Sequence, residues 1–502
     1  MAERLPTVAS TAPWLRAAVV AALAAMFAYR ISLAVADPDL YHQLSFAREA
    51  LRTGALPRSD IFAFTPTHPL VVHHEWGAGF VALLLAKTLG GAGILALRYL
   101  LAAAIAAVAV RTARLTGADG AAITVAAPVA ILLADYGFAP ARAQLYTFLG
   151  VAFTLACLER DRGGGRRWTV AHAIAFVPWV NLHGGFLIAF VLFGAYAVEA
   201  ALARRRVRHV LVLVAVEAAL VLVNPWGAAY PAYVLRAVAV PRLRIPEWAP
   251  LFAPGVPFAR HFVFATALVL VAYGLWRGRV RTGAGITILA VTAAMAICGH
   301  RFLPIFAIAW LASAPALLAE TPLADMVRSA AVRAPRALAA VAGATALAFA
   351  LLLASGRPWT LAVPNAPPSA TREGLAYPVG AARFLRASGF RGRLMTTFET
   401  GAYVTWKLHP DVLVSLDGRY EAAYPEQVFA DVMAFYDGAS APASALARYA
   451  PDAVLVPRAK YGLRARIPWP AAYDDGAFAV LVRPGVPLAP VAAPVSTEDR
   501  FP

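Results

Sequence analysis

Residues 34–54 read "AVADPDLYHQLSFAREALRTG", and this stretch decides which kind of fold the chain can form. An apolar run over residues 14–36 leads into it and is long enough to cross a bilayer. Asp37 and Asp39 follow this run at once. The first crossing therefore delivers two carboxylates to the edge of the membrane.

The same run has a second interpretation, as a signal peptide, because Ala34-Val35-Ala36 fits a cleavage site. Arg30 and Ser32 interrupt the run before that site, and we interpret it as an uncleaved anchor. Either interpretation brings Asp37 out on the far side of the membrane.

An amphipathic helix follows the two aspartates. Leu40, Leu44, Ala47 and Leu51 recur at helical spacing, whereas the charged residues fall on other faces. A helix of this kind lies in the membrane interface with its apolar side in the lipid. The alternative is an ordinary connecting helix, with the aspartates serving as its N-terminal caps.

The composition is that of a polytopic helical membrane protein. Hydrophobic residues make up 60% of the 502 residues and charged residues only 15%, which soluble domains do not show. The net charge of +17 comes largely from arginines in short loops, where they act as orientation signals. We therefore expect no nucleic acid as a partner.

The basic loops set a topology with about eleven crossings and a cytoplasmic N-terminus. They surround Arg4 and Arg16, residues 111–117, 159–168, 203–209, 277–281 and 328–336. Residues 75–89 do not fit as a crossing, and we predict that this helix lies in or dips into the outer leaflet, with the crossing at 93–110. Twelve crossings are the alternative.

This topology gathers polar residues on the outer face. Polar and charged side chains near a bilayer cost free energy unless they have hydrogen-bond or ionic partners or serve a function. We therefore expect these residues to line one polar cleft on the outer face. Its members are Asp37, Asp39, His42, His68, His73, His74, Glu75, Asp135, Arg142, Gln144, Asn181, His183, Asn224, Glu247, His300 and Arg301.

The C-terminal part turns soluble in composition. We predict a membrane domain over residues 1–358, with the first outer loop at 37–91, and a linker over 359–372. Strands alternating with helices over 373–488 predict a small α/β domain on the outer side. Residues 489–502 are predicted to form a flexible tail.

Several motifs, taken together and in this order, resemble the GT-C superfamily of membrane glycosyltransferases. They are the Asp-x-Asp loop after the first span, "HHEW", "PWVNLHGGF", "NPWG", "PEW" and "SLDGRY". The superfamily includes protein O-mannosyltransferases and the aminoarabinose transferases of lipid A, and the chain is most similar to uncharacterised bacterial GT-C-like proteins. The resemblance covers nearly the whole chain.

The resemblance implies an enzyme of the bacterial inner membrane that moves a sugar from a polyprenyl-phosphate donor to a lipid, glycan or protein acceptor. Inversion at the sugar carbon would follow from one direct displacement. Protein O-mannosyltransferases carry Asp-Glu in the first loop, whereas this chain carries Asp37-Pro38-Asp39. Which of the two carboxylates is the base is therefore left open.

Sugar transfer needs a carboxylate that takes the proton from the acceptor hydroxyl and positive charge that stabilises the departing phosphate. Asp37 and Asp39 are the candidate bases. Arg142 and Arg301 are candidates for pairing with phosphate, the alternative being contact with lipid headgroups. The further candidates for substrate binding are His42, His74, Glu75, Gln144, Asn181, His183, Glu247 and His300.

A divalent cation, Mg²⁺ or Mn²⁺, is an option at Asp37 and Asp39 because such ions prefer oxygen ligands. Zinc at His42, His73 and His74 is disfavoured, since their spacing matches no strong zinc motif.

Two other functions stay open. A lipid-linked substrate transporter would place ionisable groups near the bilayer midplane, often in repeated halves. A non-catalytic, glycan-binding scaffold would bind a lipid-phosphate sugar without turnover.

Overall fold

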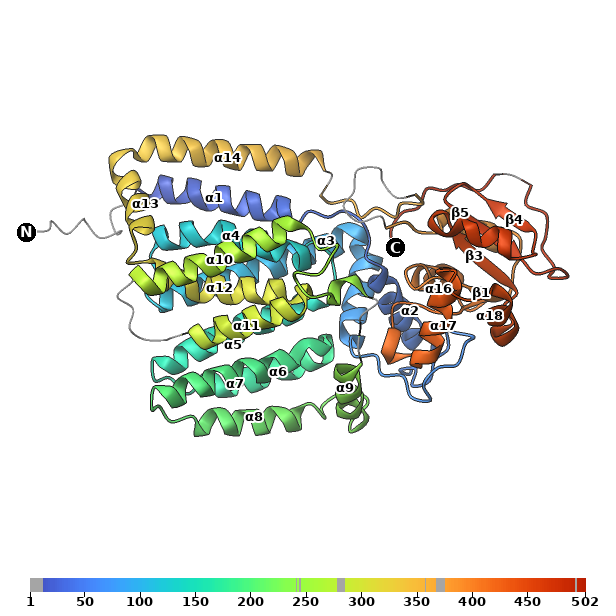
Figure 1. Ribbon diagram of the computed structural model, residues 1–502, viewed down its shortest axis with the longest axis horizontal. Helices are drawn as coiled ribbons and strands as arrows, with labels where there is room; N and C mark the ends of the chain where they lie inside the picture. The colour runs from blue at the N-terminus through green and yellow to red at the C-terminus, as the bar shows by residue number, and fades with distance from the viewer. Residues whose placement is uncertain are drawn as a thin grey trace, which may run out of the picture. The chain divides into compact units, whose positions relative to one another are not determined.

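The computed structural model describes residues 12–502 except 241, 243–244, 278–284, 357, 367–374 and 493 (Figure 1). Arg4, part of the basic loop after Arg277 and residues 367–372 of the predicted linker lie outside the described residues. The chain divides into two units, and each draws on separate stretches of sequence. Unit 1 holds the chain up to Leu33, Leu95–Gly227 and the stretch from 241 to Pro358, and unit 2 holds Ala34–Ile94, Ala228–Val240 and Trp359–Pro502.

Unit 1 is helical because its apolar runs are rich in Ala and Leu, the strongest helix formers. Its elements are α1 (Pro13–Arg30), the second part of α3 (Trp76–Leu115), α4 (Gly120–Phe138), α5 (Gln144–Arg162), α6 (Trp168–Leu182), η2 (Gly184–Phe186), α7 (Leu187–Leu202), α8 (Arg208–Leu220), η3 (Pro246–Trp248), α10 (Phe258–Arg277), α11 (Ile286–Cys298), η4 (His300–Phe302), α12 (Leu303–Leu318), α13 (Pro322–Arg333) and α14 (Pro335–Ser355).

The middle of this bundle is formed by α12 and α4, which pack against each other. The most apolar stretch of α12 is 78% buried, whereas that of α14 is only 6% buried although it is more apolar. A helix that is apolar and exposed needs an apolar surrounding. Among the described residues, six helices are long and apolar enough to cross a membrane.

Helix α3 is broken at Gly90, whose φ of 61° and ψ of −150° are not helical. Glycine adopts such a conformation at little cost because it has no Cβ. The break separates a helix ending at Leu89 from the long apolar helix that follows. It falls between the two segments, 75–89 and 93–110, that the sequence assigns to different roles.

Unit 2 is an α/β unit. Its elements are α2 (Pro38–Thr53), the first part of α3, α9 (Ala229–Ala239), α15 (Val379–Ala387), β1 (Gly392–Met395), α16 (Gly401–Leu408), β2 (Val412–Val414), η5 (Tyr420–Ala422), α17 (Glu426–Tyr436), α18 (Pro442–Tyr449), β3 (Ala453–Pro457), η6 (Arg458–Arg466), β4 (Ala471–Asp474) and β5 (Phe478–Val482).

The sheet has the order β2-β1-β3-β5-β4, with β1 parallel to β2 and β3, and β5 antiparallel to β3 and β4. Four strands fall on segments that are strand-like in the sequence, namely "RLMTTF" for β1, "DVLVSLDGRY" for β2, "DAVLVPR" for β3 and "FAVLVRP" for β5. Edge strand β4 is not predicted, because its residues are mostly exposed and carry no apolar alternation.

The first loop joins this unit by backbone pairing. Ala63 forms a parallel bridge with Val414, whose carbonyl and amide bond Phe64 and Phe62 at 3.0 Å each. Ala362 forms a parallel bridge with Val35 and an antiparallel bridge with Arg500. Segments from the beginning, middle and end of the chain therefore form one structure.

The end of the chain also packs in unit 2. Phe501 is buried beside Tyr41, with ring centroids 5.8 Å apart. Asp499 accepts a hydrogen bond of 2.9 Å from Tyr403 and pairs with Lys407 at 2.8 Å. The polar composition of the segment does not reveal these contacts.

Candidate functional site

The two aspartates of the first loop have different surroundings. Asp37 is the N-cap of α2 and accepts a hydrogen bond of 3.0 Å from the backbone amide of Asp39. It is buried, and Pro38 occupies the first helical position, where its missing amide costs nothing. Asp37 thus has a structural task at the start of α2, as its alternative interpretation predicts.

Asp39 lies in the first turn of α2 and approaches Gly418. A Cβ added to Gly418 would lie 3.0 Å from Oδ1 of Asp39 and 3.9 Å from Nδ1 of His42. The turn that contains Gly418 therefore borders both side chains, and it has room for them because Gly418 lacks a side chain. Asp39, His42 and Gly418 form the centre of the candidate site.

His42 brings an imidazole nitrogen to this point. Its Nδ1 is buried and has no hydrogen-bond partner in the part of the chain that the structure describes. Burial lowers the pKa of His42, against the opposing effect of the negative charges of Glu75 and Asp417. The neutral ring can accept or donate one hydrogen bond, according to its tautomer.

His74 and Glu75 precede the first part of α3 and form a hydrogen-bonded group. Tyr233 of α9 lies 2.9 Å from Nδ1 of His74, and Gln43 of α2 donates a bond of 2.5 Å to Glu75. Burial alone would lower the pKa of His74, but the hydrogen bond and charge of Glu75 outweigh it and raise that pKa. This group ties α2, α3 and α9 together.

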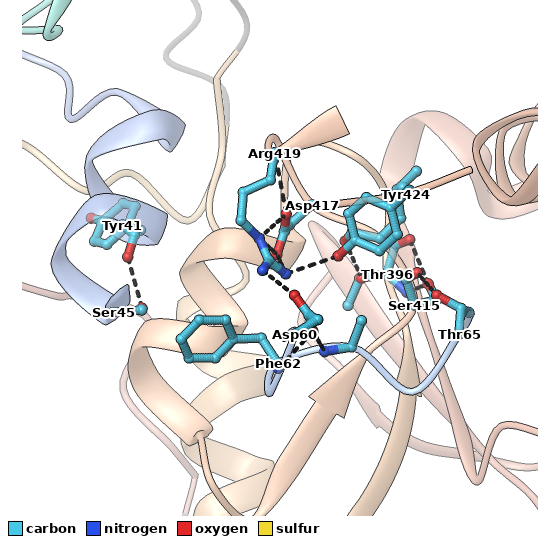
Figure 2. Close-up of polar contacts among 12 residues, drawn as sticks. Tyr41, Ser45, Asp60, Phe62, Thr65, Thr396, Ser415, Asp417, Arg419 and Tyr424 are labelled. Atoms are coloured by element: carbon cyan, nitrogen blue, oxygen red, sulfur yellow. Dashed lines mark hydrogen bonds and ion pairs between the residues drawn. The ribbon is translucent and has the colours of Figure 1, made fainter. Parts of the chain in front are cut away.

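The turn around Gly418 is held by a buried ionic network, drawn in Figure 2. Arg419 donates to both oxygens of Asp417, at 2.9 Å from Nε and 2.8 Å from Nη2, and to Tyr424 at 3.1 Å. Its Nη1 donates to Asp60 of the first loop. The other oxygen of Asp60 accepts from the backbone amides of Phe62 and Ala63.

Asp417 and Arg419 are both charged in this network. Burial raises the pKa of Asp417, but the Arg419 guanidinium outweighs it and holds that pKa below its usual value. Burial likewise lowers the pKa of Arg419, and the charges of Asp417 and Asp60 raise it well above its usual value. One cation between two carboxylates fixes the turn that borders Asp39.

Unit 1 holds a second group of predicted residues. Arg142 pairs with Glu247 at 2.6 Å, and the guanidinium of Arg301 lies 4.0 Å from the ring centroid of Trp248. The Nδ1 of His300 lies 3.1 Å from the carbonyl of Ala249. Burial raises the pKa of Glu247, but the charges of Arg142 and Arg301 outweigh it and lower that pKa. Two cations therefore surround one carboxylate.

Three residues predicted to bind substrate form hydrogen bonds between their side chains and the backbone. Gln144 donates to the carbonyl of Gly137 at 3.1 Å, and Asn181 donates to those of Val177 and Val223. His183 caps η2 through Nδ1, which accepts from the amide of Gly185 at 2.9 Å. Polar residues at helix ends satisfy carbonyls and amides that the helix leaves open.

The described residues do not form a recognisable metal site. Among the described residues, no group of three His, Cys, Asp or Glu side chains is placed to hold one. Asp37, one of the two expected ligands, already accepts the cap hydrogen bond.

Some members of the site give no signal in the sequence alone. Gln43 and Tyr233 are ordinary polar residues of helices, and Asp60 lies in a loop without periodicity. The Asp417-Gly418-Arg419 turn is recognisable, because it ends a strand with two charges around a glycine.

No family model matches the chain, and no curated protein does. Among solved structures, it is similar to the crystal structure of ArnT from Cupriavidus metallidurans in the apo state. The TM-score is 0.54 at 13% sequence identity, over 93% of this chain and 97% of that chain. The likeness shows that the chain shares the fold of that structure, so the predicted polytopic helical fold is confirmed, whereas the number of crossings stays a prediction.

Proposed function

We propose that this protein is a GT-C glycosyltransferase that moves a sugar from a polyprenyl-phosphate donor to a lipid, glycan or protein acceptor. The observation that carries the proposal is the fold, which is shared over nearly the whole length with ArnT, a lipid A aminoarabinose transferase. The apolar helices and the resemblance of the motifs support an inner-membrane location, with the reaction at the outer face.

Asp39 is the proposed base. Asp37 is engaged as the helix cap, whereas Asp39 lies beside Gly418 and His42. A carboxylate within hydrogen-bond reach of the acceptor hydroxyl would take its proton as the sugar carbon is attacked. His42, whose ring is held neutral by burial, would orient the same hydroxyl.

Arg142 and Arg301 are the proposed ligands of the donor phosphate. A guanidinium forms strong paired hydrogen bonds with phosphate oxygens, and its charge stabilises the leaving group as negative charge develops there. Glu247 pairs with Arg142 in the absence of substrate and keeps its guanidinium in one place. His74, Glu75 and His300 are the remaining proposed substrate contacts.

The test is transfer of radiolabel from a panel of polyprenyl-phosphate sugars by purified protein in native lipid. We expect Asp39→Asn to abolish transfer and Asp37→Asn, which keeps the cap, to retain it. Transfer unchanged in Asp39→Asn would remove this carboxylate from the chemistry. Binding of a donor by the wild type without any transfer would favour the glycan-binding scaffold.

One observation favours transport as a second candidate. His172 of α6 and Glu217 of α8 are buried in the bundle, with Nδ1 and Oε1 2.6 Å apart. Buried ionisable pairs within membrane helices are typical of transporters. Movement of a labelled lipid-linked sugar across proteoliposomes, lost in Glu217→Gln, would support this function over sugar transfer.

A further inference from the structure

A cavity of about 780 Å³ lies in unit 1, where three helices end or begin together. Helix α3 ends at Leu115, α5 ends at Arg162 and α6 begins at Trp168. The polar lining is strongly basic, with Arg160, Arg162, Arg166 and Arg167 against the single carboxylate of Glu159. None of these residues has a part in the proposed sugar transfer.

Two of the arginines are held in place by acidic partners. Arg162 pairs with Glu159 at 2.6 Å and with Glu199 at 2.8 Å. Arg166 pairs with the buried Asp161. The positive charges of these two arginines are therefore largely neutralised by their acidic partners.

Asp161 also fixes the aromatic part of the lining. It accepts a hydrogen bond of 2.9 Å from the indole of Trp168 and one of 2.5 Å from the hydroxyl of Tyr196. His209 of α8 lies 2.7 Å from the same carboxylate. The cavity is thus built on a buried hydrogen-bonded centre, and its shape does not depend on mobile surface side chains alone.

Arg160 and Arg167 differ from the other two arginines. Both are exposed, and neither has an acidic partner within the described ranges of the chain. Gly163 and Gly165 line the cavity between them in the sequence, so no side chain covers this part of the lining. Two uncompensated guanidinium groups are therefore available to an anion.

The position of the cavity along the helices indicates where that anion comes from. Helix α3 is apolar enough to cross a membrane and ends at the cavity, so the cavity lies at the level of the lipid headgroups. Leu115 beside it is 49% exposed, which suits an acyl chain and not a soluble ion.

We propose that this cavity binds the phosphate headgroup of an anionic phospholipid, with Arg160 and Arg167 as its principal ligands. Guanidinium groups recognise phosphate oxygens by paired, charge-assisted hydrogen bonds. Basic pockets between membrane helices on the cytoplasmic side are suited to such headgroups. The excess of arginines in this loop agrees with a cytoplasmic position.

The experiment measures lipid binding to the full-length protein in an uncharged detergent by native mass spectrometry. The probes are phosphatidylglycerol, phosphatidylcholine and inorganic phosphate. We expect preferential binding of phosphatidylglycerol and an affinity about thirtyfold lower in Arg160→Gln/Arg167→Gln, since each arginine near anionic lipid contributes about 1 kcal/mol. Inorganic phosphate should not displace the lipid at equal concentration.

The matched control is Arg333→Gln/Arg336→Gln, which removes two exposed arginines of unit 1 away from the cavity lining. It should bind phosphatidylglycerol as the wild type does. Equal binding of the two lipids, an equal loss in both double variants, or displacement by inorganic phosphate would overturn the proposal. Because the readout is lipid binding, sugar transfer can fail without affecting the result.

Discussion

Arg419 and Asp60 lie 359 positions apart in the sequence, and a buried ion pair joins their side chains. The pair fixes the first loop to the turn after β2. Gly418, which borders Asp39, is the residue immediately before Arg419. The geometry at the proposed base therefore depends on a contact that lies outside the reacting groups.

Removal of one partner from this network should be strongly destabilising. We expect Arg419→Ala to lower the free energy of unfolding by about 3–5 kcal/mol, because it leaves Asp417 and Asp60 buried without their cation. Thermal unfolding in detergent, followed by tryptophan fluorescence, measures the change.

The control for this variant is the ion pair of Arg391 and Asp411, which is 3.5 Å long and has side chains 79% and 52% exposed. Arg391→Ala should change stability by less than about 0.5 kcal/mol. An equally small effect of Arg419→Ala would show that the buried network does not hold the unit together.

Gly418→Ala should impair sugar transfer without unfolding the protein. The new methyl group would lie 3.0 Å from Oδ1 of Asp39, so the carboxylate must shift. The carboxylate has to move by a few tenths of an ångström, so we expect a loss of rate smaller than the roughly hundredfold that a misplacement of about 1 Å can cost. Gly462→Ala is the control, because a Cβ there meets nothing within 4 Å. Equal rates in both variants would contradict the placement of Asp39 in the reaction.

Substitutions of Asp37 separate its charge from its cap. Asp37→Ala should lower the free energy of unfolding by about 1 kcal/mol, because the amide of Asp39 loses its acceptor. Asp37→Asn should keep stability near that of the wild type, since asparagine caps helices as well as aspartate does. Chemical denaturation of the three proteins provides the comparison, and a stable Asp37→Ala variant would mean that the cap contributes nothing.

His42 and His74 should affect the free energy of unfolding in opposite ways as the pH changes. Burial lowers the pKa of His42, so the unfolded chain takes up a proton first as the pH falls below about 6.5, and stability declines. The pKa of His74 is raised by Glu75, which outweighs its burial. Its stabilising contribution is complete below about pH 6.5 and is lost as the pH rises through the folded-state pKa.

Unfolding temperatures of the wild type, His42→Gln and His74→Gln between about pH 5 and about pH 8 test this difference. His42→Gln should lose less stability than the wild type on acidification. His74→Gln should lose less on the alkaline side. Parallel curves for all three proteins would contradict both assignments.

The sequence predicts most helices and four strands because their patterns are local. Apolar runs of membrane length mark α4, α12 and α14, and short runs of valine and leucine mark β3 and β5. The break at Gly90 is also anticipated, since two apolar segments meet there without a loop.

The site was harder to predict, because polar residues at helix ends look alike in a sequence. Gln144 and Asn181 have the same appearance as Arg142, yet their amides bond to backbone carbonyls. The choice between Asp37 and Asp39 rests on which one caps α2, and that depends on backbone geometry. Asp60 could not be assigned at all, because its partner lies far along the chain.

The bridges that Ala362 makes with Val35 and Arg500 have a consequence for biosynthesis. The ribosome releases Val35 and Asp60 hundreds of residues before their partners, so unit 2 is completed only after the last segment emerges. Until then the first loop has no strand to pair with, and Asp60 has no arginine partner. A chain truncated before Trp359 lacks these partners, and a fragment that begins there contains Arg419 but not Asp60. Neither half on its own therefore contains all the partners that unit 2 pairs in the complete chain.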